Sequence, residues 1–465
     1  MPKKSWTLEQ LKKALSSRKD VKGWIITQEH VHRRERYFLL DGNALAIDQD
    51  RDVYVQSILA RIMVPLNKPD RQGEITKKLF PSLPLAPQLD SAVAAALQTD
   101  YQAWSLPEKI ASPLSDLKTT DPRMAEDLAG TMNDLTKRVK DCTAQKRPTV
   151  FSSAELFLAV HDRELHLSTG LVHRSSQSRA YAEAAYSMME APRSSERPKS
   201  GTSVPQSDEY LNMRWSVHLD DLAIEEIFAE TTDRAEHSLD VSKPTTGKYP
   251  VIIDADVLAT LFNTHVSQLS AQNAYHGLPF VKPGEDLIPE AKGDLITMTL
   301  DPFLPFGADT TVLSDQGIEQ RPVKVVDRNR VITTLTDKQY ADYLGTHPTT
   351  ARGNLVIEAG KLSHADLTKQ APVVMEILQF SGLFADPNSG TFSSEIRLAK
   401  LYDNRKGSVT YMKGGSLSGS ITENFANARF SREVVKRAQF QSNSMQGSGY
   451  FGPAFVLLND VSIVG

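Results

Sequence analysis

The chain has 465 residues, of which 40% are hydrophobic and 24% charged, so it is long enough for two or three domains with sizeable apolar cores. Its 53 basic residues are offset by 57 acidic ones, which gives a formal net charge of −4 without the basic excess that usually accompanies nucleic-acid binding. The single cysteine, Cys142, excludes an intrachain disulfide and a cysteine-based zinc site, and it fits a reducing cytoplasm. The sequence contains neither a signal-peptide core nor a run of about 18 apolar residues, so we expect a soluble, cytoplasmic protein that binds neither nucleic acid nor membrane.

The first part of the chain, residues 1–148, is predicted to be an N-terminal α+β domain. Thr7 and Gln10 have the spacing of a capping box that opens a short helix. Alternating apolar and polar residues predict strands on both sides of a turn at residues 41–43. A longer helix is expected to begin at residues 121–122, where Asp is followed by Pro.

Residues 149–244 are predicted to form a middle domain. The alternation of apolar and polar residues between 154 and 189 predicts a meander of antiparallel strands, and residues 222–235 have the period of a helix. Residues 191–209 contain three prolines and many serine and basic residues, which indicates a solvated, mobile loop. This loop either covers a groove or is a simple connection.

Residues 245–465 are predicted to form a β-rich C-terminal domain, because short apolar runs there are separated at close intervals by Gly, Pro, Asn and Asp. The domain starts with an apolar run at residues 250–253 that predicts a buried strand leading directly into an amphipathic helix at 256–270. His265 lies on the apolar stripe of this helix, where a lone histidine is most often a core or interface residue. The expected fold class is therefore α+β, with a mixed α/β N-terminal region before a large β-rich domain, either a twisted sheet or barrel-like, whose open edges could hold an extended peptide.

The strand-to-helix segment resembles the TldD/TldE (PmbA) family, whose active members carry a zinc-binding H-E-x-x-x-H at this place. Aligned through Leu261-Phe262, the six motif positions are Asn263, Thr264, His265, Val266, Ser267 and Gln268. Further pieces follow in the order and spacing of the family. They are the end of a strand at Asp301-Pro302, a G-D-F-S-like strand from Gly390, a strand at Ser408 to Tyr411, and the closing strand SGYFGPAFVLLNDVSIVG.

The resemblance implies a TldE-like member of the family that lacks the zinc motif. Asn263, Thr264 and Gln268 occupy positions where active members have zinc ligands or the catalytic glutamate, and their side chains are poor substitutes for imidazole and carboxylate. Active members also share a late cysteine, whereas residues 442–449 contain none. We therefore assign no catalytic residue and expect no cofactor in this chain.

The same resemblance implies partners. A TldD-like zinc peptidase subunit is expected to carry the metal, in a heterodimer or a larger assembly that binds unfolded or modified peptides. Two other classes of function stay open: a homodimeric peptide-binding or scaffold protein without a peptidase partner, and an enzyme with an unrecognised site that does not use zinc.

Two histidine-containing stretches outside this segment are further candidates for metal sites. His30 and His32 would share one face of a strand near Glu35, but the neighbouring arginines would repel a cation, so a charged strand end is the better interpretation. The run from His161 to His166 lacks the spacing of helical metal motifs and is expected to contain a hairpin turn at residues 162–163.

Overall fold

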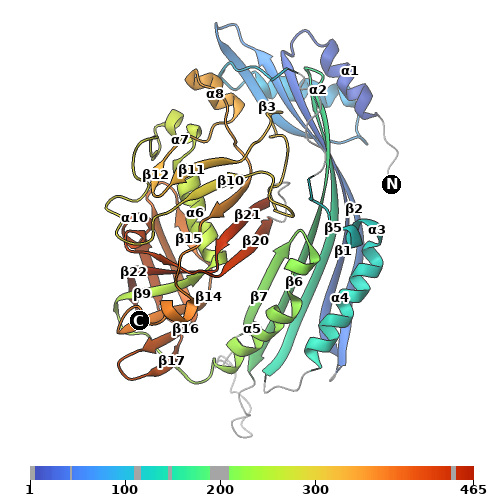
Figure 1. Ribbon diagram of the computed structural model, residues 1–465. Helices are drawn as coiled ribbons and strands as arrows, with labels where there is room; N and C mark the ends of the chain where they lie inside the picture. Colours follow the sequence, from blue (N-terminus) through green and yellow to red (C-terminus); the bar gives the residue numbers. More distant parts are fainter. Residues whose placement is uncertain (1–5, 42–43, 109–116, 145–148, 189–208, 441–446) are drawn as a thin grey trace, which may run out of the picture.

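The computed structural model describes residues 6–41, 44–108, 117–144, 149–188, 209–440 and 447–465 (Figure 1). Its α-helices are α1 Leu8–Ser17, α2 Leu85–Ala96, α3 Pro122–Glu126, α4 Leu128–Thr143, α5 Ile224–Glu236, α6 Ala255–Gln268, α7 Ala271–His276, α8 Lys338–Leu344, α9 His364–Leu367 and α10 Ile421–Phe425. None of the helices in these described ranges is long and apolar enough to cross a membrane. Most of the loop expected to be mobile, residues 191–208, lies outside them.

The main sheet has thirteen strands among the described residues. They are β1 Gly23–Asp41, β2 Ala44–Pro65, β3 Arg71–Leu79, β4 Tyr101–Gln102, β5 Thr149–Leu167, β6 Val172–Met188, β7 Glu209–Ser216, β10 Met298–Asp301, β11 Val323–Asp327, β12 Arg330–Val331, β13 Asn354–Ile357, β20 Val434–Phe440 and β21 Gly447–Pro453. Their order is β12-β11-β10-β13-β21-β20-β7-β6-β5-β1-β2-β3-β4. The long strands β1, β2, β5 and β6 form one side of the molecule in Figure 1, and most of the C-terminal half forms the other.

Strand pairing in this sheet crosses the domain boundaries expected from the sequence. β1 pairs with β5 over residues 25–38 and 154–167, so residues 1–148 and 149–244 share one sheet. β7 then meets β20 at Trp215 and Ala438, which joins strands from beyond residue 245 to the same sheet. The division into three segments is therefore not a division into separate sheets.

A second sheet lies in the C-terminal half. Its strands are β8 Val241–Ser242, β9 Gly247–Asp254, β14 Val373–Phe380, β15 Phe384–Asp386, β16 Thr391–Asp403, β17 Ser408–Met412, β18 Ser416–Ser420, β19 Arg429–Phe430 and β22 Phe455–Val464. The order β14-β9-β22-β18-β16 closes on itself because β14 also pairs with β16, which makes a small barrel. A barrel is one of the two forms expected for this domain, and only the open edges expected to hold a peptide are wrong for these five strands, since closure satisfies the edges that an added peptide strand would need.

Local sequence rules account for several helix boundaries. Thr7 and Gln10 form the expected capping box at the start of α1, with hydrogen bonds of 2.8 and 3.3 Å between each side chain and the other residue's N–H. Asp121 caps α3 and Pro122 follows it, as expected, but the helix is interrupted. Asp127 caps a second helix, α4, because its carboxylate accepts the N–H of Gly130 at 2.8 Å.

The hairpin turn expected at residues 162–163 is wrong. β5 runs without interruption from Thr149 to Leu167 and pairs with β1 on one side and β6 on the other. The polar residues that suggested a turn are instead held in the sheet. Arg163, for example, donates to the Asp315 carboxylate at 2.7 Å, so its charge is neutralised by a residue about 150 positions away in sequence.

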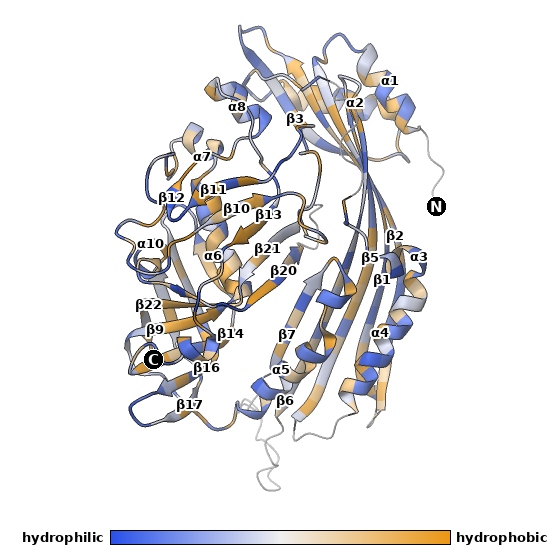
Figure 2. Ribbon diagram, in the orientation of Figure 1, coloured by the Kyte–Doolittle hydropathy of each residue, from blue (hydrophilic) through white to orange (hydrophobic). Residues whose placement is uncertain are grey.

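The two faces of the long strands have different surroundings. On one face, Leu156, Leu158 and Ala182 form an apolar core with Met132 of α4 and Ile227 of α5. A second large core surrounds α6 in the C-terminal half, where Figure 2 shows apolar residues along β9, β10 and β13. Packing in these two cores holds the main sheet and the barrel in place, and the candidate sites lie on these two elements.

Candidate functional site

The strand-to-helix segment is present as expected. β9 is held between β14 and β22 in the barrel, and the chain enters α6 directly after it. The Asp254 carboxylate caps the helix by accepting the N–H groups of Asp256 and Val257 at 3.1 and 3.2 Å. Leu261 and Phe262 are fully buried, so the apolar face of α6 lies against the core as its sequence period predicts.

His265 is part of that core. Its side chain is 1% exposed, and its ring lies 5.9 Å from that of Phe425 and 6.2 Å from that of Phe262, between ring centroids. Neither ring nitrogen has a hydrogen-bond partner among the described residues. Burial lowers the pKa of His265 to about 4, and the nearby Gln268 amide opposes this only in part, so the ring is neutral at pH 7. Of the two settings predicted for His265, core or interface, the structure shows the core.

The other three motif positions have separate surroundings. Asn263 is exposed, whereas Thr264 is only 4% exposed. The Gln268 amide is half-buried and donates to the Pro387 carbonyl at 3.1 Å. Two amides, a buried hydroxyl and a buried imidazole do not make a zinc site, which takes three nitrogen, sulfur or carboxylate ligands that converge on an open position.

A cavity of about 350 Å³ lies beside the exposed edge of α6. Its lining consists of Asn263, Val266, Ser267, Ser270, Gln272, Asn273, Leu335, Asp337, Tyr340 and Ala351. The single carboxylate among these, Asp337, is already engaged, because it accepts the N–H of Tyr340 and the Gln316 amide at 2.8 and 2.9 Å. The pocket therefore offers mostly neutral amide and hydroxyl groups, which suit a polar uncharged ligand such as a peptide group.

The pocket also lacks a nucleophile with a base beside it. The Ser270 hydroxyl donates to the Ser267 carbonyl at 2.7 Å and accepts the N–H of Asn273, so it caps α7. The described residues that line this cavity include no histidine. Hydrolysis by a serine relay, which needs a base within hydrogen-bond reach of the hydroxyl, has no support in this arrangement.

The two histidine stretches do not form metal sites in the described part of the chain. His32 bonds the Asp52 carboxylate at 2.8 Å and stacks on Tyr54, while Glu35 is held by Arg33 at 2.6 Å. Strand alternation places the two histidines and Glu35 on opposite faces of β1. Across all the described residues, no group of three or more His, Cys, Asp or Glu side chains is arranged to hold a metal ion.

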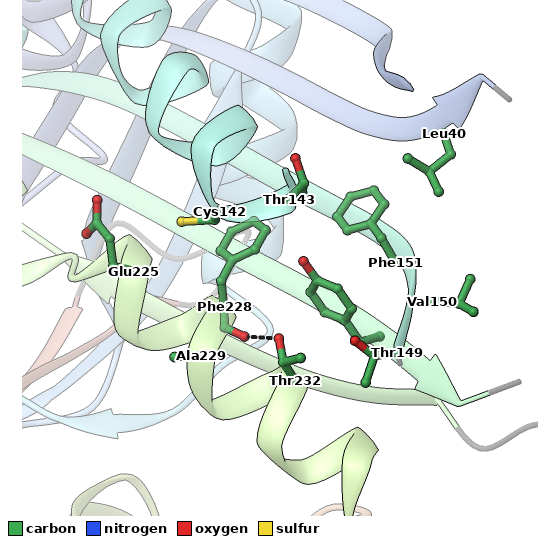
Figure 3. A pocket seen from close by; sticks show the side chains of 11 residues that line it. Leu40, Cys142, Thr143, Thr149, Val150, Phe151, Glu225, Phe228, Ala229 and Thr232 are labelled. Carbon is green, nitrogen blue, oxygen red and sulfur yellow. Dashed lines mark hydrogen bonds between the residues drawn. The ribbon is translucent and has the colours of Figure 1, made fainter. Parts of the chain in front are cut away.

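A second cavity, of about 260 Å³, was not anticipated from the sequence. It lies where α4 and α5 approach the ends of β5 and β6, and Figure 3 shows Phe151, Phe228 and Cys142 among its lining residues. Burial raises the pKa of the Cys142 thiol to about 11, so the thiol is protonated at pH 7 and is a weak nucleophile. The lining mixes apolar side chains with threonine hydroxyls, and the carboxylate among the described lining residues, Glu225, accepts a hydrogen bond from Arg138 at 2.7 Å.

Sequence comparison places the C-terminal half in a known family. Residues 246–465 match the family described as PmbA/TldA metallopeptidase C-terminal domain. A segment of 152 residues is 24% identical to a zinc metalloprotease TldD homolog from Saccharolobus solfataricus. That match covers 32% of this chain, and the chain spans about a third (34%) of the relative's length.

Comparison with solved structures extends over the whole chain. TldE from Thermococcus kodakarensis superposes with a TM-score of 0.73 at 17% identity, covering 98% of this chain and 100% of that one. A proposed DNA gyrase modulator from Thermotoga maritima gives 0.73 at 18% identity over 99% and 100% of the two chains. Another from Bacteroides thetaiotaomicron gives 0.72 at 14% over 98% of each. These likenesses show the fold over nearly the whole chain, whereas the match to the PmbA/TldA metallopeptidase C-terminal domain is confined to residues 246–465.

Proposed function

We propose that the chain is a non-catalytic, TldE-like subunit of a two-subunit zinc metallopeptidase. In this proposal a TldD-like partner carries the zinc, and this chain completes the proteolytic chamber and binds unfolded or modified peptides. The relative from Saccharolobus solfataricus is a zinc metalloprotease, and the chain superposes on a TldE over nearly its full length.

The observation that carries the proposal is that α6 packs as a capped, amphipathic helix while the residues aligned with the zinc motif are not arranged as metal ligands. The helix keeps its cap and its buried apolar face, so the framework of the motif is intact. The motif positions themselves are used otherwise: His265 fills the core, Gln268 ties α6 to Pro387, and Asn263 lines a pocket. A helix preserved without its metal ligands is explained by assembly or peptide binding more simply than by chemistry.

The pocket beside α6 supports a peptide-binding role. Its amides and hydroxyls can hydrogen-bond to main-chain groups, which every peptide presents whatever its sequence. Such contacts suit a subunit that accepts loosely structured substrates. The alternatives, a homodimeric scaffold and an enzyme with a non-zinc site, gain no comparable arrangement from the residues described above.

The experiment is reconstitution. This chain and a zinc-bearing TldD-type chain from the same cell are purified separately, and cleavage of an unstructured peptide is measured for each alone and for the mixture. The mixture should cleave the peptide at least tenfold faster than the zinc-bearing chain alone, and this chain alone should cleave nothing. Equal activity of the zinc-bearing chain with and without this one would contradict the proposal.

A matched pair of variants tests whether the α6 pocket takes part. Asn263→Arg places a long side chain at the pocket and should lower activity of the mixture without unfolding the chain, because Asn263 is exposed. Asn388→Arg makes the same change at an exposed residue that does not line the pocket, and it should leave activity unchanged. Equal effects of the two would remove the pocket from the proposal.

A further inference from the structure

The face of the main sheet opposite α4 and α5 carries aromatic and acidic side chains on neighbouring strands. Because Leu156, Leu158 and Ala182 point toward these helices, the intervening residues of β5 and β6 point the other way. We call this opposite side the inner face. Register places Phe157 of β5 opposite Tyr181 of β6, and Tyr181 opposite Trp215 of β7.

These three rings belong to an aromatic row that crosses five strands of the sheet. Ring centroids are 5.4 Å apart between Tyr37 and Phe157, 5.1 Å between Phe157 and Tyr181, 4.6 Å between Tyr181 and Trp215, and 5.6 Å between Trp215 and Phe440. Both ends of the row already hold a guanidinium group. Arg51 lies 5.1 Å from the Tyr37 ring and Arg179 lies 4.4 Å from the Phe440 ring, so the rings of this row do accept cations.

Next to the aromatic row lie two carboxylates, Glu155 and Glu183, which are directly opposite each other on β5 and β6. Both are half-buried. Among the described residues no lysine, arginine or histidine forms an ion pair with either, although the Tyr181 hydroxyl donates to Glu183 at 2.5 Å. Like charges opposite each other in a sheet are unfavourable.

Glu35, on the same face, is a carboxylate whose charge is neutralised by arginine side chains. It is 6% exposed and is held by Arg33 at 2.6 Å and by Arg51 at 3.5 Å. Glu155 has no such partner in the part of the chain that the structure describes, and burial together with the charges of Glu183 and Glu35 raises its pKa. The centre of the inner face is therefore negative and aromatic, and no described cationic side chain pairs with its two carboxylates, whereas a guanidinium group lies at each end of the row.

We propose that the inner face at Glu155, Glu183 and the neighbouring aromatic row binds a lysine or arginine side chain of an extended peptide. A cation placed there would pair with two carboxylates and lie beside Phe157 and Tyr181, which is the charge complementarity that the face lacks. The inference deepens the proposed function, on which it rests for the peptide nature of the occupant, and it names basic residues as the preferred substrate feature.

The test compares binding of two fluorescent, unstructured peptides to the full chain by anisotropy. They are identical except that one has two lysines where the other has glutamines. The wild-type chain should bind the lysine peptide at least tenfold more tightly, and added salt should reduce this preference. In the variant Glu155→Gln/Glu183→Gln, which keeps the size of both side chains, the preference should fall to about one.

The control Glu358→Gln/Glu395→Gln removes the same charge from exposed positions of the C-terminal half and should keep the preference. Retention of the preference in Glu155→Gln/Glu183→Gln would overturn the inference. Equal binding of both peptides to the wild-type chain would overturn it too, while leaving the peptide-binding role intact. If neither peptide binds, both the inference and that role are removed.

Discussion

Helix α6 and the inner face of the main sheet differ in how their polar groups are compensated. On α6 the His265 side chain is buried among Phe262 and Phe425 and is neutral at pH 7, so it serves the packing of the core. On the inner face Glu155 and Glu183 stay half-buried without a cation beside them in the described residues. A polar residue absorbed by a core supports the fold, whereas an uncompensated charge on an accessible face indicates a ligand. The predictions below test this contrast, beginning with the largest expected effect.

Removing the ring that supports His265 should cost the most. Phe262 is fully buried and contacts the rings of Phe425 and Phe430. Phe262→Ala should lower the free energy of unfolding in urea by about 3–5 kcal/mol, because it leaves a cavity in the core. The neighbouring exposed substitution Asn263→Ala should change it by less than about 0.5 kcal/mol. Similar costs for the two variants would mean that α6 does not pack as described.

His265→Leu should separate a core role from a functional one through its pH dependence. The folded pKa is lowered from 6.5 to about 4, so the unfolded chain binds a proton that the folded chain does not. Wild-type stability therefore falls as the pH drops from about 6.5 toward 4, and the leucine variant should escape that loss. The variant's advantage should reach about 3 kcal/mol near pH 4.

At pH 7 the same variant should be as stable as the wild type or slightly more so, because neither histidine nitrogen is hydrogen-bonded to a described residue. His347→Leu, at an exposed histidine, is the matched control. Urea unfolding at pH 7, 5.5 and 4.5 measures the difference for each variant. A His265→Leu chain that is strongly destabilised at every pH would show that the imidazole makes a specific contact.

The smallest expected effect is on the inner face. Glu155→Gln/Glu183→Gln should raise the free energy of unfolding at pH 7 by about 0.5 kcal/mol, because it removes a like-charge pair between neighbouring strands. The gain should vanish in acid, because the raised pKa of Glu155 lets this carboxyl lose its charge as the pH falls, which removes the like-charge repulsion. A loss of stability at pH 7 would indicate that these carboxylates are compensated after all. The contrast between the two regions therefore predicts that the glutamine substitutions on the sheet stabilise the chain at pH 7. It also predicts that the leucine substitution on α6 stabilises it in acid.

Local patterns in the sequence were sufficient for part of this picture. The run at residues 250–253, the Asp254 cap and the apolar stripe of α6 all act within a few residues, so periodicity and capping rules place them correctly. The core position of His265 followed from the same stripe. The capping box of α1 was predicted for the same reason.

Long-range pairing could not be predicted in this way. The polar residues at 162–163 suggested a turn because nothing nearby in sequence shows that Arg163 meets Asp315. The opposition of Glu155 and Glu183 depends on the register of β5 and β6, and the aromatic row needs five strands in order. Closure of the barrel likewise depends on the pairing of β14 with β16. Each of these features is set by tertiary structure rather than by local propensity.

The zinc content of the purified chain tests the central claim most directly, namely that α6 has kept its packing but lost its metal chemistry. The full chain, expressed without a partner in zinc-supplemented medium, is dialysed and analysed for metal by mass spectrometry. Because Asn263, Thr264 and Gln268 are poor ligands and His265 is buried, the account predicts far less than one zinc per chain. One tightly bound zinc per chain, lost on substitution of His265 or Gln268, would contradict it.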